Sequence, residues 1–153
     1  MSKKLVLLLA ASLGPAPGQE APAGDRPAHL LPGDSAAAFR LNGTAGEFAK
    51  MSTAAVTGQP FSNALRINVT KTPQRPADVQ IAAPVDAAMA AGDVLMVSFW
   101  LRSVTPGEAT IDAGFRASSA GFRGPPPLNM PAVAGTEWKK IQLPFALARA
   151  ATL

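Results

Sequence analysis

The chain has 153 residues, of which 48% are hydrophobic and 16% are charged, and its formal net charge at pH 7 is +4. This length allows about one domain, and the composition excludes a disordered polar tail and a polytopic membrane protein. Because the chain has no Cys and a single His, thiol nucleophiles, disulfides and Cys/His zinc sites are excluded. Its 13 Gly and 15 Pro residues interrupt helices and therefore favour short strands joined by turns.

Residues 1–23 have the pattern of a secretory signal peptide. Lys3 and Lys4 precede an apolar run, and small residues follow it. The run is about nine residues long, less than half of the roughly 20 that a membrane span needs. We expect this segment to be cleaved, which predicts a secreted or periplasmic bacterial protein with no membrane attachment. The alternative is a buried N-terminal helix or strand.

Residues 24–34 are rich in Pro, Gly and Ala and predict a linker, after which residues 35–153 form one domain. His29 lies within this linker, where an exposed residue without a catalytic role is expected. Removal of residues 1–18 takes away two Lys and leaves 12 basic and 10 acidic residues, a net charge of +2. The remaining Arg residues are scattered along the chain, so no nucleic-acid partner is predicted.

Alternation of apolar and polar residues predicts the strands. Residues 64–70 form the first, and residues 78–83 form a second after a turn that contains two prolines. Residues 84–92 are Ala-rich, but flanking Pro and Gly limit any helix there, so this segment is interpreted as a connection.

The strongest pattern is at residues 93–103, which predicts a central strand with residues 108–118 as its hairpin partner. Residues 121–131 contain three consecutive prolines and predict a loop. Residues 137–147 predict a last strand, at an edge or with a bulge because of an internal Pro. Short strands with frequent turns favour an all-β fold, an antiparallel β-sandwich. The aromatic residues expected in its core are Phe39, Phe99, Phe115 and Phe145.

Four segments, ALRINVT, PADVQI, AAGDVLMVSFWLRS and GTEWKKIQLPF, follow one another in this order. Together they resemble the CenC-type carbohydrate-binding modules, over about residues 34–147. The resemblance implies a galactose-binding-like jelly roll, of the kind attached to secreted bacterial xylanases and other glycoside hydrolases. Modules of that family continue with further strands beyond this point. The resemblance therefore implies that the domain is truncated after the strand at residues 137–147. The Asn-Gly-Asp-Phe-Glu signature that would support a structural calcium ion is not evident. A structural calcium ion therefore stays an alternative without a supporting motif, and no other cofactor is expected.

The acidic residues do not predict a catalytic site. Glycoside hydrolysis needs two carboxyl groups on either side of one bond, whereas most acids of this chain lie at predicted turns or strand starts. Asp112 lies within a predicted strand, on its solvent-facing side. The chain also lacks a Gly-x-Ser-x-Gly elbow, a phosphate loop and a metal-spaced His pair. Whether the protein is associated with enzyme activity is left open, and any hydrolase activity is expected in a linked or co-secreted glycoside hydrolase.

Sugar binding requires an aromatic ring for the apolar face of a pyranose and planar polar groups for its hydroxyls. Such groups lie on the strand faces opposite the predicted core and in the Pro-rich loop. The predicted ligand-binding residues are Arg66, Asn68, Gln80, Trp100, Arg102, Gln142 and Phe122. Trp138 is expected to pack in the core or at an edge.

These observations predict a secreted, noncatalytic carbohydrate-binding domain. Its partner would be a polysaccharide or oligosaccharide of the xylan or β-glucan type, to which it would direct a glycoside hydrolase. Two alternatives stay open: an N-terminal fragment of a glycosyl hydrolase, and a structural or protein-interaction β-sandwich without a glycan ligand.

Overall fold

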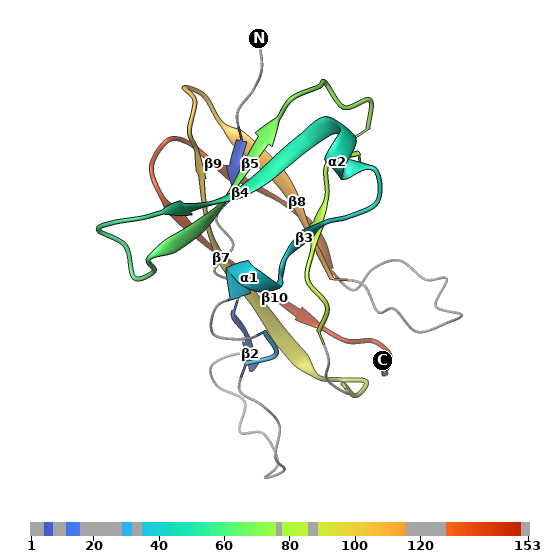
Figure 1. Ribbon diagram of the computed structural model, residues 1–153. Helices are drawn as coiled ribbons and strands as arrows, with labels where there is room; N and C mark the ends of the chain where they lie inside the picture. Colours follow the sequence, from blue (N-terminus) through green and yellow to red (C-terminus); the bar gives the residue numbers. More distant parts are fainter. Residues whose placement is uncertain are drawn as a thin grey trace.

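A computed structural model describes residues 5–7, 12–15, 29–31, 35–75, 78–85, 89–115 and 128–150. These residues form mostly β-strands, and every strand pair among them is antiparallel (Figure 1). The two helices of this part, α1 (Ser35–Ala38) and α2 (Ala45–Phe48), are single turns. None of the helices in the described ranges is long and apolar enough to cross a membrane. The predicted all-β class is therefore confirmed.

The longest strand, β7 (Val94–Ser103), has neighbours on both sides. One edge pairs with β10 (Lys139–Ala146), and the other pairs with β1 (Leu5–Leu7) and β2 (Ser12–Pro15). The remaining strands form three two-stranded sheets. These sheets are β3 (Arg40–Leu41) with β6 (Ile81–Ala82), β4 (Ala49–Ala55) with β5 (Asn63–Val69), and β8 (Ala109–Phe115) with β9 (Leu128–Ala134).

Four of the five predicted strands are confirmed to within a few residues, as β5, β7, β8 and β10. The strand predicted at residues 78–83 is reduced to β6, which has only two residues. The structure adds β4, which was not predicted because its Ala-rich sequence gives little contrast between its two faces. Pro144 lies in β10, an edge strand of its sheet, as predicted.

Two predictions about the chain after β7 are wrong. The predicted hairpin between β7 and β8 does not form, because β7 pairs with β10 whereas β8 pairs with β9. The predicted loop at residues 121–131 ends early, since β9 begins at Leu128 and includes Pro131. Both strands of a two-stranded sheet are edges, so a Pro can occupy one of them. Residues 116–127, which include Phe122, lie outside the described residues.

The N-terminal strands fall within the predicted signal peptide. Leu5–Leu7 and Ser12–Pro15 extend antiparallel along β7, with Leu5 opposite Ser103 and Leu13 opposite Val97. Cleavage of the signal peptide stays a prediction. The predicted linker also contributes to the fold, because Leu31 is buried, whereas His29 is exposed as expected.

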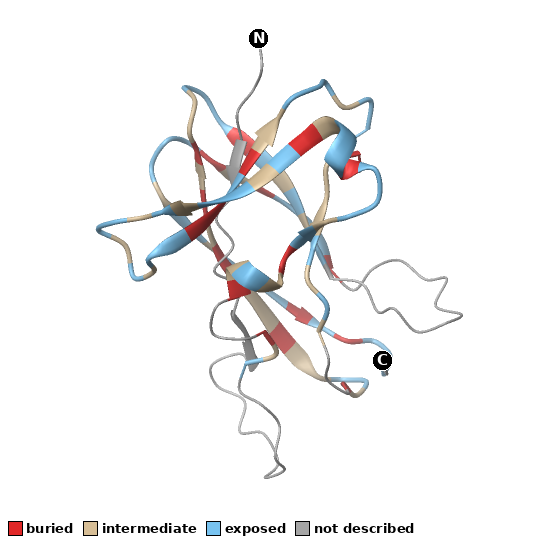
Figure 2. Ribbon diagram, viewed as in Figure 1, coloured by how far each residue is buried: buried red, intermediate tan, exposed pale blue. Residues whose placement is uncertain are grey.

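The main core is formed where residues of β7 and β10 pack with residues of β4, β5 and β9. Phe99 and Leu101 of β7 are fully buried, and Leu143 and Phe145 of β10 pack in the same cluster. Figure 2 shows buried positions recurring along these strands between less buried ones. A second, smaller cluster contains Leu31, Phe39 and Leu65. Burial of the predicted core residues Phe39, Phe99 and Phe145 is thus confirmed.

The turn before β7 fixes where that strand begins. Gly92 has a φ of 87°, a conformation that only glycine adopts without strain, and the Asp93 carboxylate accepts a hydrogen bond of 2.7 Å from the Ala90 N–H. The Gly92 N–H donates to the carbonyl of Leu147, and the Leu147 N–H donates to that of Asp93. The start of β7 is therefore held against the end of β10.

Candidate functional site

Strand alternation separates β7 and β10 into two faces. Leu95, Phe99 and Leu101 face the core, so the even-numbered residues of β7 face the other way. The register of β10 on β7 brings Lys140 opposite Trp100, and Gln142 opposite Ser98. We call this surface the β7–β10 outer face; its residues are Met96, Ser98, Trp100, Arg102, Trp138, Lys140, Gln142 and Pro144.

Three aromatic rings meet on this outer face. The Phe61 ring lies 5.8 Å from the Trp100 ring and 5.5 Å from the Trp138 ring, measured between centroids. The second contact is edge-to-face, with an interplanar angle of 86°, and both distances are typical of stabilising aromatic pairs. All three side chains are half-buried. We call Phe61, Trp100 and Trp138 the aromatic cluster.

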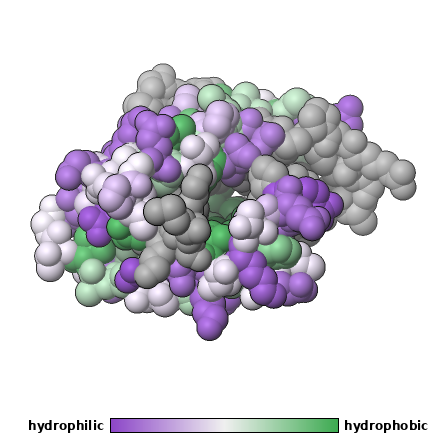
Figure 3. Space-filling model, turned by 90° about the horizontal axis from the view of Figure 1, so that it is seen from above, coloured by the Kyte–Doolittle hydropathy of each residue, from purple (hydrophilic) through white to green (hydrophobic). Residues whose placement is uncertain are grey.

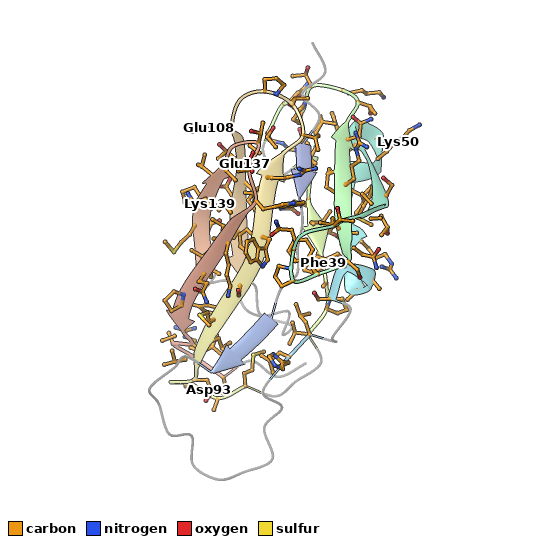
Figure 4. All side chains as sticks on the ribbon, turned by 90° about the vertical axis from the view of Figure 1, so that its left-hand side faces the viewer. Phe39, Lys50, Asp93, Glu108, Glu137 and Lys139 are labelled. Carbon is orange, nitrogen blue, oxygen red and sulfur yellow. The ribbon has the colours of Figure 1, made fainter. Side chains whose placement is uncertain are left out.

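Phe61 reaches the outer face from the loop between β4 and β5. This loop is closed by a hydrogen bond of 2.8 Å from the Val56 N–H to the Ser62 carbonyl. Gly58 has a φ of 72° in the same loop, which lets the chain turn back. Figure 4 shows β7 between β10 and the hairpin of β4 and β5, on which Lys50 is labelled. The loop therefore brings a ring from the hairpin onto both tryptophans.

Arg102 lies beside the aromatic cluster. Its guanidinium carbon is 4.6 Å from the centroid of the Trp138 ring, within the range of a cation–π contact. The Arg102 Nε atom is buried and has no hydrogen-bond partner among the described residues. The contact with the Trp138 ring therefore helps to hold this guanidinium in place.

Polar groups surround Trp100 on the same face. Gln142 is exposed, and its amide nitrogen lies 3.7 Å from the Met96 Sδ, a weak acceptor. Ser98 is buried beneath its neighbours, with 6% of its surface exposed. Lys140 is exposed and is the direct cross-strand neighbour of Trp100. An amine, a guanidinium and an amide thus border the indole of Trp100.

The structure brings three of the predicted ligand-binding residues together and separates the others. Trp100, Arg102 and Gln142 share the β7–β10 outer face. Arg66 and Asn68 lie in β5, which pairs with β4 and not with β7. The Asn68 Oδ1 atom is buried and finds no hydrogen-bond partner in the part of the chain that the structure describes.

Gln80 and Phe122 are also apart from this face. Gln80 precedes β6, where its side-chain oxygen accepts a hydrogen bond of 3.4 Å from the Asn42 amide. Its backbone carbonyl accepts a second bond from the Asn42 N–H. Phe122 lies outside the described residues, so its predicted role is not placed.

Of the aromatic cluster, Phe61 was not predicted from the sequence, and Trp138 was not predicted to bind a ligand. Trp138 was expected to pack in the core or at an edge, and it packs half-buried against Phe61 just before the edge strand β10. A signal for this position was present, since Trp138 shares the parity of Lys140 and Gln142 and not that of the core residue Leu143. Phe61 lies in a loop, where no periodicity indicates which strand it will contact.

Asp78 is the buried acid of the described residues. Its carboxylate accepts hydrogen bonds from the N–H groups of Gln74 and Arg75, at 3.0 and 2.9 Å, and forms an ion pair of 3.1 Å with the Arg75 guanidinium. The hydrogen bond from the Arg75 backbone is the largest cause of a lowered pKa for Asp78, and the Arg75 side chain lowers this pKa further. Burial acts in the opposite direction and raises the pKa. This acid stabilises a turn, as predicted for acids at turns.

The described residues contain no group of three His, Cys, Asp or Glu side chains that could hold a metal ion. Asp112 is exposed on β8, as predicted. Seen from above, hydrophilic side chains are spread around the molecule and are not gathered in one patch (Figure 3).

Comparison of this chain with family models, with curated proteins and with solved structures finds no match.

Proposed function

We propose that this protein is a secreted, noncatalytic carbohydrate-binding domain and that its ligand binds on the β7–β10 outer face. The observation that carries the proposal is the aromatic cluster bordered by polar side chains of the same two strands. Binding sites for small ligands combine aromatic surface with a few polar groups that fix the orientation. A pyranose has a matching pair of surfaces, an apolar ring face and a rim of hydroxyls.

The polar groups suit hydroxyl recognition. The Arg102 guanidinium and the Gln142 amide are planar donors, and the amide oxygen of Gln142 also accepts. Both flank Trp100: Arg102 follows it by two residues on β7, and Gln142 lies opposite Ser98, which precedes it by two residues. A sugar stacked against Trp100 would therefore meet hydrogen-bonding groups along the strand in both directions.

Binding without bond cleavage is supported by the distribution of carboxyl groups. β4, β5, β7 and β10 contain no Asp or Glu, although glycosidases use a carboxyl pair at the scissile bond. A domain of this kind acts by tethering, which raises the concentration of a linked glycoside hydrolase near its polysaccharide. Xylan and β-glucan are the ligand types that we propose.

For the fold we propose an antiparallel β-sandwich of the galactose-binding-like jelly-roll type, as in the CenC-type modules. Support comes from the main core, in which residues of β4, β5, β7 and β10 pack with Leu128 and Ala132 of β9. A shared core between strand pairs that are not hydrogen-bonded to one another is what a layered β-fold requires.

The chain offers a direct optical test, because both of its Trp residues belong to the aromatic cluster. The full chain is titrated with xylo-oligosaccharides and with mixed-linkage β-glucan oligosaccharides while Trp emission and the thermal midpoint are followed. A ligand that binds only the folded state raises the midpoint. We expect a saturable emission change and a raised midpoint, both reduced in Trp100→Phe. Met130→Ala is the matched control, since Met130 is exposed on β9.

A structural role is the second candidate, and the contacts of Phe61 favour it. Because this ring touches both tryptophans, the aromatic cluster also fastens the loop between β4 and β5 to the β7–β10 outer face. Trp100→Phe would lower stability under either function, so the ligand-induced shift is the deciding measurement. If no saccharide changes emission or midpoint, the carbohydrate-binding proposal is wrong and the structural role stands.

A further inference from the structure

Basic residues are concentrated in the strands that build the candidate site. The chain has 10 acidic residues, but none of them lies in β4, β5, β7 or β10. The same four strands contain Lys50, Arg66, Arg102, Lys139 and Lys140. The surroundings of the aromatic cluster are therefore positively charged, in a chain whose overall charge is only +4.

Two of these cations belong to the β7–β10 outer face itself. Lys140 lies opposite Trp100, and Arg102 lies against Trp138. Neither cation has an ion-pair partner among the described residues, whereas Arg75 has Asp78. Two positive charges thus flank the tryptophans without an ion pair to a carboxylate of the described residues, although Glu137 directly precedes Trp138.

The guanidinium of Arg102 is suited to a planar anion. Its Nε atom is buried, with no hydrogen-bond partner among the described residues, so a ligand can meet only the two Nη groups; the contact with Trp138 orients them without using a donor. Arginine presents its donors in a rigid fork that matches both oxygens of a carboxylate. The amine of Lys140 is a point charge on a flexible stem and can follow a carboxylate to several positions.

From these observations we infer that the β7–β10 outer face prefers saccharides that carry carboxylates, that is, oligosaccharides containing uronic acids. The inference rests on the proposed carbohydrate-binding function and names the ligand class of that site. A uronic acid keeps the apolar ring face that a tryptophan requires and adds one negative charge. Since cross-strand neighbours have Cβ atoms about 5 Å apart, a sugar on Trp100 places its carboxylate near the Lys140 stem.

The test compares two forms of one saccharide. The full chain is titrated with oligogalacturonate and with its methyl ester, which has the same sugars without the charges. We expect the acid form to bind about tenfold more tightly at low ionic strength. We expect most of this advantage to disappear in 0.5 M NaCl, because salt screens exposed charges.

Two adjacent lysines supply a matched pair of variants. Lys140→Gln is expected to weaken oligogalacturonate binding about three- to fivefold, the upper part of the range of an exposed ion pair. Lys139→Gln removes the same charge one residue away and is expected to change the affinity less than about 1.5-fold. Lys139 is also exposed, but it lies opposite Leu101, whose side chain is buried in the core. Figure 4 shows Lys139 at the end of β10 near Glu137 and Glu108.

The outcomes separate this inference from the proposed function. Equal affinities for the acid and the ester would overturn the inference and leave carbohydrate binding intact. If neither form nor a neutral xylo-oligosaccharide binds, the proposed function itself fails. Competition by poly-glutamate as strong as by oligogalacturonate would show a general response to polyanions and would overturn the inference. Equal losses of affinity in the Lys139→Gln and Lys140→Gln variants would also overturn the inference.

Discussion

The guanidinium carbon of Arg102 lies 4.6 Å from the centroid of the Trp138 ring, so a cation of β7 contacts an indole beside β10. Contacts of this kind contribute about 0.5–1 kcal/mol when partly exposed. Arg102→Met keeps most of the apolar stem and removes the charge, so we expect it to lower the free energy of unfolding by about that amount. Urea unfolding measures this difference.

The control for that prediction is Arg66→Met. Arg66 is exposed on β5, and no ring contact is seen for it among the described residues. We expect this variant to change the free energy of unfolding by less than about 0.5 kcal/mol. Equal losses in the two variants would show that the contact with Trp138 adds no stability.

Phe61 is the residue that joins the two tryptophans. Each of its two ring contacts is expected to contribute about 0.5–1.5 kcal/mol, so Phe61→Ala should lower the free energy of unfolding by about 1–3 kcal/mol. Because the substitution uncovers both indoles, Trp emission should also move to longer wavelength. Unchanged emission in a folded variant would mean that Phe61 does not cover the tryptophans in solution.

Which residues of β7 face the core was predictable from the sequence, because burial of one face imposes a period of two on the strand. Leu95, Phe99 and Leu101 are buried as that period predicts. The neighbours of β7 were not predictable in the same way. Alternation identifies the buried face of a strand, but it carries no information about which strand lies beside it, and the predicted pairing with β8 failed for this reason.

The candidate site was predictable to the same extent. Trp100, Arg102 and Gln142 lie together because β10 pairs with β7 and because all three share the outer parity. Arg66 lies on the outward face of β5, as alternation predicts. However, β5 pairs with β4 and not with β7, and alternation along one strand does not indicate its partner. Phe61 enters through a loop, where position is set by the closure of the hairpin and not by any periodic pattern.

The parity of β7 can be tested with neighbouring residues. Leu101 is fully buried in the main core, and burial of this kind makes Leu→Ala substitutions cost about 2–5 kcal/mol. We expect Leu101→Ala to lower the free energy of unfolding, measured with urea, by clearly more than Arg102→Met does. Similar costs for these two adjacent positions would contradict the assignment of core and outer faces.

Asp78 gives the protein a pH-dependent contribution to stability. Hydrogen bonds from the Arg75 backbone, followed by its side chain, hold the pKa of Asp78 below 3.8, the ordinary value of a free Asp side chain. A lowered folded-state pKa contributes stability above the unfolded value, and this contribution is lost as pH falls through the folded value. Asp78→Asn should therefore be less stable than the parent at pH 7, and the difference should shrink below about pH 4.

Urea midpoints at pH 7, 5 and 3 measure this effect, with Asp112→Asn as the control because Asp112 is exposed on β8. The urea midpoint of Asp112→Asn should equal that of the parent at each pH. A difference between Asp78→Asn and the parent that stays constant from pH 7 to pH 3 would rule out an effect of the carboxylate charge.

Deletion of residues 1–23 tests what β1 and β2 do for β7. Both strands occupy the edge of β7 that faces away from β10, so their removal leaves that edge unpaired. Loss of this pairing should lower the thermal midpoint by about 5–10 °C. An unpaired edge also presents free N–H and C=O groups to other chains, so we expect self-association that increases with protein concentration, measured by analytical ultracentrifugation. A deletion variant that stays monomeric with the midpoint of the full chain would mean that β7 needs no strand on this edge, and that residues 1–23 can be lost without cost to the fold.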